Sequence, residues 1–237
     1  MARIFAATRG PEGWQNHLGD PDRHWRAGFS AMSTARCWEH WQEVPPEIAA
    51  LLGRQVTLQL ALVEHKVPLP GSTLGDTQCD VFALVRADGR DVALAVEAKV
   101  DEPFGPTVGD WLDGAGQGKL RRLAALCDLL DTADPPDGDL RYQLFHRTAA
   151  AVIEARRFHR PVAAMVVQSF SPGGRWRDDF LAFAAGIGAP VGADGTGRKR
   201  LRCGIELVLG WAAGEQRFRE PLPAATAGVR RGAPWTG

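Results

Sequence analysis

The sequence lacks the features that mark membrane-spanning and secreted chains. Nowhere in its 237 residues does an apolar run approach the ~20 residues that a transmembrane helix needs. The first ten residues contain Arg3 and Arg9 but no sustained apolar core, so they do not resemble a secretory signal. We therefore expect a cytoplasmic protein.

The sequence also lacks patterned cysteines and a net charge. The four cysteines, Cys37, Cys79, Cys127 and Cys203, are widely scattered and form no CxxC pair. A zinc site or a disulfide framework would need closer, patterned spacing. Neither GxSxG, a Walker-type loop nor GxGxxG is present. The 28 basic and 28 acidic side chains give a formal net charge of zero. This balance argues against a chain-wide electrostatic grip on nucleic acid but leaves room for a local basic cleft.

Lysine is scarce among the basic residues. Of the 28 basic side chains, only Lys66, Lys99, Lys119 and Lys199 are lysines. A lysine among so many arginines is a candidate for a position that needs a compact, tunable ammonium group.

Hydrophobic periodicity predicts a single α/β domain over residues 1–237, with a central mixed sheet flanked by helices. We expect a core over residues 30–170, an irregular N-terminal lead over 1–29, C-terminal additions over 171–219 and a flexible tail over 220–237. Helices are predicted at Ser30–Gln42, Pro46–Leu52, Gln117–Leu130, Leu140–Phe158 and Trp176–Ala185. Strands are predicted at Gln55–Glu64, Gln78–Ala87, Arg90–Val100, Pro161–Ser169 and Cys203–Trp211.

Asp88-Gly89 joins two of these strands and is a strong hairpin signal, because both residues tolerate positive φ. A two-residue turn here sets Ala87 against Arg90, and the same register sets Asp80 directly opposite Glu97. Lys99 lies two residues beyond Glu97 and therefore points to the same face. The hairpin thus brings two carboxylates and one ammonium group together.

This grouping is costly without a counter-ion. Two opposed carboxylates repel each other, and Glu97 lies in an otherwise apolar strand. A divalent cation relieves both costs, and carboxylate oxygens suit Mg²⁺ or Mn²⁺. A plain structural ion pair of Lys99 with Glu97 or Asp80 is the alternative.

Asp80 followed by Glu97-Ala98-Lys99 on the next strand resembles the PD-(D/E)XK, or restriction-endonuclease-like, superfamily. The resemblance covers about residues 30–170, and it implies that Asp80, Glu97 and the Ala98 carbonyl bind the metal while Lys99 serves the attacking water. Cys79 precedes Asp80 where the superfamily name has proline. The stretches VEAKVDEPFGPTV, RYQLFHRTAAAVIEA and VVQSF also resemble a bacterial family of unknown function within this superfamily.

Two further glutamates are candidate metal ligands. Glu64-His65-Lys66 repeats the E-x-K spacing but has no Asp just upstream, so we prefer Glu97. Glu64 is predicted either to contribute to the site or to end its strand in solvent. Glu39, on the first helix, matches a position where the superfamily often adds an acidic ligand; an exposed helix glutamate is the alternative.

Polar residues on two predicted helices are candidates for phosphate binding. Gln143, His146 and Arg147 share one helix face at spacings of three and four residues. By analogy with superfamily branches they contact phosphate; a solvated polar stripe is the alternative. Lys119 and Arg122 flank the apolar face of the preceding helix, and Lys119 lies near its N-terminus, which favours anions. A solvated face is again the alternative.

Taken together, these features predict a Mg²⁺-dependent phosphodiesterase or nuclease acting on DNA. A two-fold dimer would suit cleavage of both strands. Two alternatives stay open: an inactive nuclease-fold module that binds nucleic acid or a protein, and a metal-dependent hydrolase of a small phosphate ester. A narrow, apolar pocket at Asp80 would favour the small ester, and an open, basic groove would favour DNA.

Overall fold

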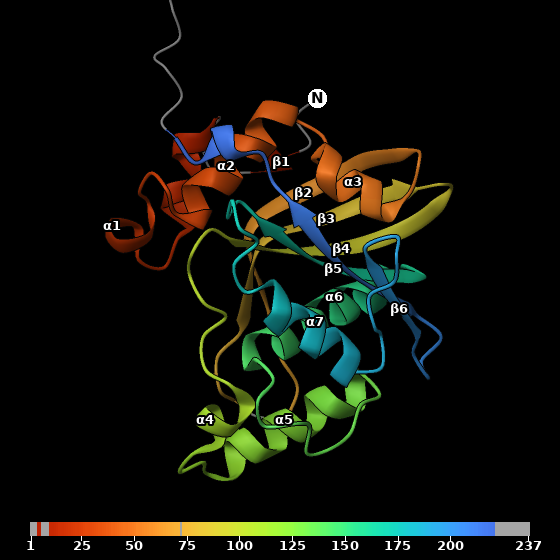
Figure 1. Ribbon diagram of the computed structural model, residues 1–237. Helices are drawn as coiled ribbons and strands as arrows, with labels where there is room; N and C mark the ends of the chain where they lie inside the picture. Colours follow the sequence, from red (N-terminus) through yellow and green to blue (C-terminus); the bar gives the residue numbers. More distant parts are fainter. Residues whose placement is uncertain (1–3, 6–9, 72, 221–237) are drawn as a thin grey trace, which may run out of the picture.

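A seven-stranded mixed sheet forms the centre of the computed structural model, which describes residues 4–5, 10–71 and 73–220 (Figure 1). The strand order is β1-β2-β3-β4-β5-β7-β6. The strands span Ile4–Phe5 (β1), Val56–Val67 (β2), Thr77–Ala87 (β3), Arg90–Lys99 (β4), Val162–Ser169 (β5), Thr196–Arg200 (β6) and Glu206–Ala213 (β7). The predicted α/β class with a mixed sheet is therefore confirmed.

The five central strands of the sheet form an antiparallel part and a parallel part, whereas the edge strand β1 runs parallel to β2 and β6 antiparallel to β7. β2, β3 and β4 pair in antiparallel fashion, whereas β4, β5 and β7 run parallel to one another. The link from β4 to β5 carries three helices, as parallel neighbours require a long crossover. β4, the strand that carries Glu97 and Lys99, lies where the two parts meet.

Helices cover both faces of the sheet. The helices span Pro21–His24 (α1), Ser30–Trp41 (α2), Pro46–Leu52 (α3), Val108–Leu112 (α4), Gln117–Leu129 (α5), Tyr142–Arg157 (α6) and Arg177–Gly186 (α7), with 3₁₀ turns at Pro11–His17 (η1) and Gln216–Phe218 (η2). One face packs on α5, α6 and α7, and the other on α2 and α3. None of the described helices has the length and apolar character needed to cross a bilayer.

Buried aromatic side chains anchor both layers. Phe145 of α6 and Phe183 of α7 meet edge to face, with ring centroids 5.0 Å apart. On the opposite face Trp38 of α2 is fully buried, and its Nε1 donates to Gln168 Oε1 at 3.1 Å. The core thus fixes α6 and α2 on either side of β4 and β5, and α6 carries part of the site described below.

The structure adds elements that periodicity does not predict. Residues 101–116 lie between the predicted elements Arg90–Val100 and Gln117–Leu130 but contain α4, and the short strands β1 and β6 extend the sheet at its edges. The expected N-terminal lead contains η1 and α1. The predicted flexible tail lies outside the described residues, apart from Glu220.

Candidate active site

The hairpin of β3 and β4 has the predicted register. The strands pair from Ala87 with Arg90 to Val81 with Val96, and Asp88 and Gly89 turn with φ of 46° and 80°. Asp80 and Glu97 follow one step beyond the last pair. There Asp80 Oδ2 accepts a hydrogen bond from the Ala98 amide at 2.6 Å, which holds the Asp80 carboxylate against β4.

The neighbouring strand β2 adds a third carboxylate. Val63 pairs with Val81 and the ladder resumes two residues later, so Glu64 lies opposite Asp80. The strand continues to Val67, and the interpretation of Glu64 as a solvated strand end is therefore wrong. Glu64, Asp80 and Glu97 form a line across three neighbouring strands.

Glu97 is buried and surrounded by donors. The residue is only 2% exposed. Its Oε1 accepts hydrogen bonds from Lys99 Nζ at 2.6 Å and from Gln143 Nε2 at 2.8 Å. Arg147 Nε donates to the other oxygen, Oε2. Burial opposes ionisation of Glu97, but the charges of Arg147 and Lys99 outweigh it and lower the pKa to about 2. Glu97 is therefore an anion with two cationic partners.

Asp80 and Glu64 have a different environment. Among the described residues neither forms an ion pair, and Glu64 Oε2 accepts only from Gln78 Nε2, at 2.6 Å. Burial, followed by the charges of Glu97 and Glu64, raises the pKa of Asp80 well above its usual range. Burial also raises the pKa of Glu64 to about 7, although the Gln78 hydrogen bond opposes this shift. Both carboxyl groups thus resist ionisation next to Glu97.

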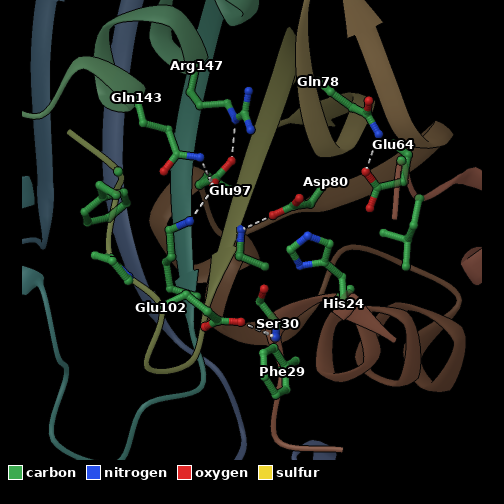
Figure 2. Close-up of a pocket in the computed structure, with 18 of the residues that line it drawn as sticks. His24, Phe29, Ser30, Glu64, Gln78, Asp80, Glu97, Glu102, Gln143 and Arg147 are labelled. Carbon is green, nitrogen blue, oxygen red and sulfur yellow. Dashed lines mark hydrogen bonds and ion pairs between the residues drawn. The ribbon is translucent and has the colours of Figure 1, made fainter. Parts of the chain in front are cut away.

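The carboxylates face a cavity of about 620 Å³, which we call the active-site cavity. Figure 2 shows Gln143 and Arg147 of α6 on one side, and His24, Phe29 and Ser30 on the other. The Ser30 amide donates to Glu102 Oε1 at 2.9 Å and so attaches the start of α2 to the segment after β4. The remaining lining residues are Leu18, Gly19, Asp20, Ala31, Glu64, Gln78, Asp80, Glu97, Ala98, Lys99, Glu102, Pro103, Phe104, Gly105, Pro106, Tyr142 and His146.

The predicted polar face of α6 turns toward this cavity. Gln143 and Arg147 bind Glu97, whereas His146 Nδ1 lies 2.8 Å from Thr77 Oγ1. Burial and the charge of Arg147 lower the pKa of His146 to about 3, so this imidazole is neutral. The interpretation of this face as a solvated stripe is wrong, because its side chains form hydrogen bonds with Glu97 and Thr77.

A family model described as a domain of unknown function (DUF6946) matches residues 7–216. The chain belongs to this DUF6946 family. No curated protein and no solved structure matches this chain. The match spans every residue that lines the active-site cavity, so the site lies within the family's domain.

Three predicted site residues of this DUF6946 chain lie elsewhere. Glu39 accepts from Trp14 Nε1 at 2.9 Å and from Gln42 Nε2 at 2.7 Å, and it does not line the active-site cavity. Glu39 is therefore not placed as a ligand of this site. Lys119 and Arg122 line an adjoining cavity instead, together with Trp111 of α4 and the segment at Leu74 and Gly75.

Sequence reasoning missed several residues of the site. Gln78, two residues before Asp80, points to the same face by strand alternation, and this signal was available. His24 and Ser30 reach the cavity through long-range packing that no local pattern indicates. Glu102 was likewise unmarked, although its carboxylate binds the amides of Ser30 and Val100.

The donor chemistry fits a hard divalent cation. Asp80 and Glu64 offer carboxylate oxygens without a cationic partner among the described residues, and burial, followed by the neighbouring carboxylates, raises their pKa values. Such oxygens suit Mg²⁺ or Mn²⁺. No group of three or more His, Cys, Asp or Glu side chains in the described part of the chain has the arrangement of a metal site. The predicted ligand set is Asp80, Glu97 and the Ala98 carbonyl, with Glu64 or Glu39 as a further candidate.

Proposed function

We propose that this chain is a metal-dependent phosphodiesterase, acting on DNA, with a restriction-endonuclease-like core. The observation that carries the proposal is the line of Glu64, Asp80 and Glu97 across three strands, with Lys99 beside it at the floor of a cavity. Two of these carboxylates have raised pKa values, so a divalent cation would remove an existing electrostatic cost.

Asp80 and Glu97 would hold the cation with the Ala98 carbonyl, and Glu64 is a further candidate. When bound, Mg²⁺ or Mn²⁺ supplies Lewis-acid stabilisation of charge on a phosphate and lowers the pKa of water. Gln143 and Arg147 fix the Glu97 carboxylate from α6, and the Ala98 amide fixes Asp80 from β4. These contacts hold the carboxylates before substrate arrives, which is the preorganisation that catalysis requires.

Lys99 has the geometry of a donor. Its Nζ donates to Glu97 Oε1 and lies 5.2 Å from the centre of the Phe104 ring. An ammonium group in an ion pair is suited to hydrogen bonding with a phosphate oxygen or an attacking water rather than to removing a proton. We therefore assign Lys99 to orientation and charge stabilisation.

Asp80→Ala and Lys99→Ala test the proposal. With Mg²⁺ or Mn²⁺ present, each should reduce hydrolysis of DNA and of bis(p-nitrophenyl) phosphate by at least ~100-fold, the scale of losing one preorganised charge. Asp91→Ala, at the far end of β4, is the matched control and should leave hydrolysis unchanged. Unchanged hydrolysis in both site variants would sink the proposal.

A second candidate is an inactive nuclease-fold module that binds nucleic acid or a protein. The ion pairs of Glu97 with Lys99 and Arg147 favour it, because they satisfy both carboxylate oxygens without a metal. Calorimetry with Mn²⁺ separates the two candidates. An active site should bind Mn²⁺ in a manner that Asp80→Ala abolishes, whereas a retired site should release no heat in either protein.

A third candidate is a hydrolase of a small phosphate ester. The volume of the active-site cavity falls within the ~300–1,000 Å³ of small-ligand sites, and aromatic and acidic side chains line it. Duplex DNA would be expected to bind an open basic groove at Asp80, and the residues that line the active-site cavity do not form such a groove. The choice between a small ester and a DNA strand therefore depends on what adjoins the cavity.

A further inference from the structure

A second cavity of about 440 Å³ adjoins the active-site cavity. The two share Gln78, Tyr142, His146 and Arg147 as lining residues, so a ligand that extends beyond one cavity meets the other. The rest of the second cavity consists of Leu69, Leu74, Gly75, Asp76, Thr77, Trp111, Lys119 and Arg122. None of these residues has a part in the proposed hydrolysis.

The two cavities have opposite charge. The lining of the active-site cavity contains two permanent cations, Lys99 and Arg147, against five carboxylates: Asp20, Glu64, Asp80, Glu97 and Glu102. The second cavity adds Lys119 and Arg122 with Asp76 as its one carboxylate, while Arg147, which both cavities share, is paired with Glu97. A polyanionic ligand placed across both would find its electrostatic complement in the second cavity.

Main-chain carbonyl groups orient the cations of the second cavity. Lys119 Nζ donates to the Trp111 carbonyl at 2.7 Å, and the Arg122 guanidinium donates to the carbonyls of Leu74 and Gly75. A carbonyl oxygen carries no net charge, so these contacts position the Lys119 ammonium without neutralising it. Among the described residues Lys119 forms no ion pair with a carboxylate, and its charge remains available to an anion.

Aromatic and apolar groups surround these cations. The Trp111 and Tyr142 rings stack with centroids 3.8 Å apart, and Lys119 Nζ lies 5.2 Å from the centre of the Trp111 ring. Leu74 at the cavity and Leu120 beside Lys119 are large hydrophobic residues that are each 43% exposed. Cations interleaved with exposed apolar and aromatic groups are typical of surfaces that bind the backbone and bases of single strands.

We propose that the second cavity is a subsite for single-stranded DNA, which binds the nucleotide next to the one in the active-site cavity. Lys119 contacts its phosphate, and Trp111 and Leu74 contact its base. The inference rests on the proposed function for the position of the scissile bond, although binding to the second cavity does not require hydrolysis. A single strand fits because α6 and the segment 18–30 wall the active-site cavity on two sides.

The test measures binding of a fluorescent single-stranded DNA of about ten nucleotides by anisotropy, in EDTA, at several salt concentrations. Lys119→Ala should weaken binding roughly three- to tenfold and reduce the slope of log K against log salt by ~0.7, the loss of one phosphate contact on a single strand. Lys119→Arg should retain most of the slope. Arg121→Ala removes the same charge from an exposed position on α5 and should leave the slope unchanged.

Hydrolysis of bis(p-nitrophenyl) phosphate with Mn²⁺ is measured in parallel, because this small ester needs only the active-site cavity. Arg121→Ala should not change it. If the small ester is hydrolysed but Lys119→Ala and Arg121→Ala bind DNA alike, or the wild-type protein binds no single strand, the subsite is overturned and the hydrolase stands. If DNA binding depends on Lys119 but no ester is hydrolysed, the subsite stands and the proposed hydrolysis fails.

Discussion

The α6 side and the β2–β3 side of the active-site cavity differ in electrostatic balance. On the α6 side, Glu97 has Lys99, Arg147 and Gln143 as donors, and its pKa falls to about 2. On the β2–β3 side, Asp80 and Glu64 have amide donors only, and their pKa values rise. Burial acts on all three carboxyl groups, so the difference comes from where α6 places its cation.

Cationic partners balance the charge on the α6 side, whereas the carboxyl groups on the β2–β3 side have none among the described residues. The α6 side is electrostatically complete and should behave like a buried ion pair, costly to break. The β2–β3 side holds excess carboxyl groups and should become more favourable when a cation binds or a carboxyl group is removed. The following predictions test this division, from the largest expected effect to the smallest.

Arg147→Met should produce the largest loss of stability. It leaves Glu97 buried with one cation fewer, and breaking a buried pair in this way costs ~3–5 kcal/mol. Urea unfolding measures the change. Arg86→Met alters an ion pair with Asp91 in which the arginine is 56% and the aspartate 33% exposed, and it should cost less than ~1 kcal/mol. Equal losses in the two variants would show that the α6 side is not a coupled structural unit.

Glu97→Gln and Asp80→Asn should change stability in opposite directions in EDTA at neutral pH. Glu97→Gln leaves Arg147 and Lys99 buried without their anion and should cost ~2–3 kcal/mol. Asp80→Asn keeps an oxygen for the Ala98 amide and removes a crowded acid, so stability should rise by up to ~1 kcal/mol. A loss in Asp80→Asn as large as that in Glu97→Gln would contradict the division.

The two sides should also titrate in different pH windows. The pKa of Glu64 is higher in the folded protein, about 7, than its ordinary value of 4.5, so the folded state binds more protons and loses stability as pH rises through this window. Glu97 has a lowered pKa, and its contribution is lost only as pH falls from 4.5 toward 2.

Urea unfolding in EDTA from pH 4.5 to 7.5 measures the first window. Glu64→Gln should remove a decline in the free energy of unfolding on the order of 1 kcal/mol, after allowance for solvent screening of this partly buried group. Glu12→Gln, at an exposed position, is the control and should keep the decline. An unchanged decline in Glu64→Gln would assign it to another group.

The smallest effects should come from the two glutamines, one on each side. Gln78→Ala removes the hydrogen bond that lowers the pKa of Glu64, so that pKa should rise further, by less than ~1 unit. Gln143→Ala leaves Glu97 with both cations, and the pKa of Glu97 should change less. NMR titration of the carboxyl carbons measures both, and a larger shift at Glu97 would reverse the assignment of the two sides.

The sequence contained enough information for the hairpin and for much of the α6 side. The Asp88-Gly89 turn sets the register that places Asp80 beside β4, and helical spacing puts Gln143 and Arg147 on one face. Both are local rules in which residue spacing fixes direction. The same kind of rule should have marked Gln78.

Long-range packing and irregular backbone account for what the sequence did not reveal. The position of Glu64 opposite Asp80 depends on a register shift between Leu58 and Leu60, which no residue pattern in β2 indicates. Lys119 lines the second cavity together with Trp111 of α4, a helix of only five residues that is too short for its periodicity to predict. The sequence of β6, TGRKR, has no apolar alternation, and the strand forms at the sheet edge.

The ion pair between Glu97 and Arg147 has a consequence for the order of folding. Glu97 belongs to a local hairpin, but its guanidinium partner lies fifty residues further along the chain. A two-stranded hairpin is marginal by itself, and this one carries a carboxylate that is costly to bury alone. The hairpin can complete its burial only when α6 docks, so β4 and α6 should gain protection from hydrogen exchange in one cooperative step.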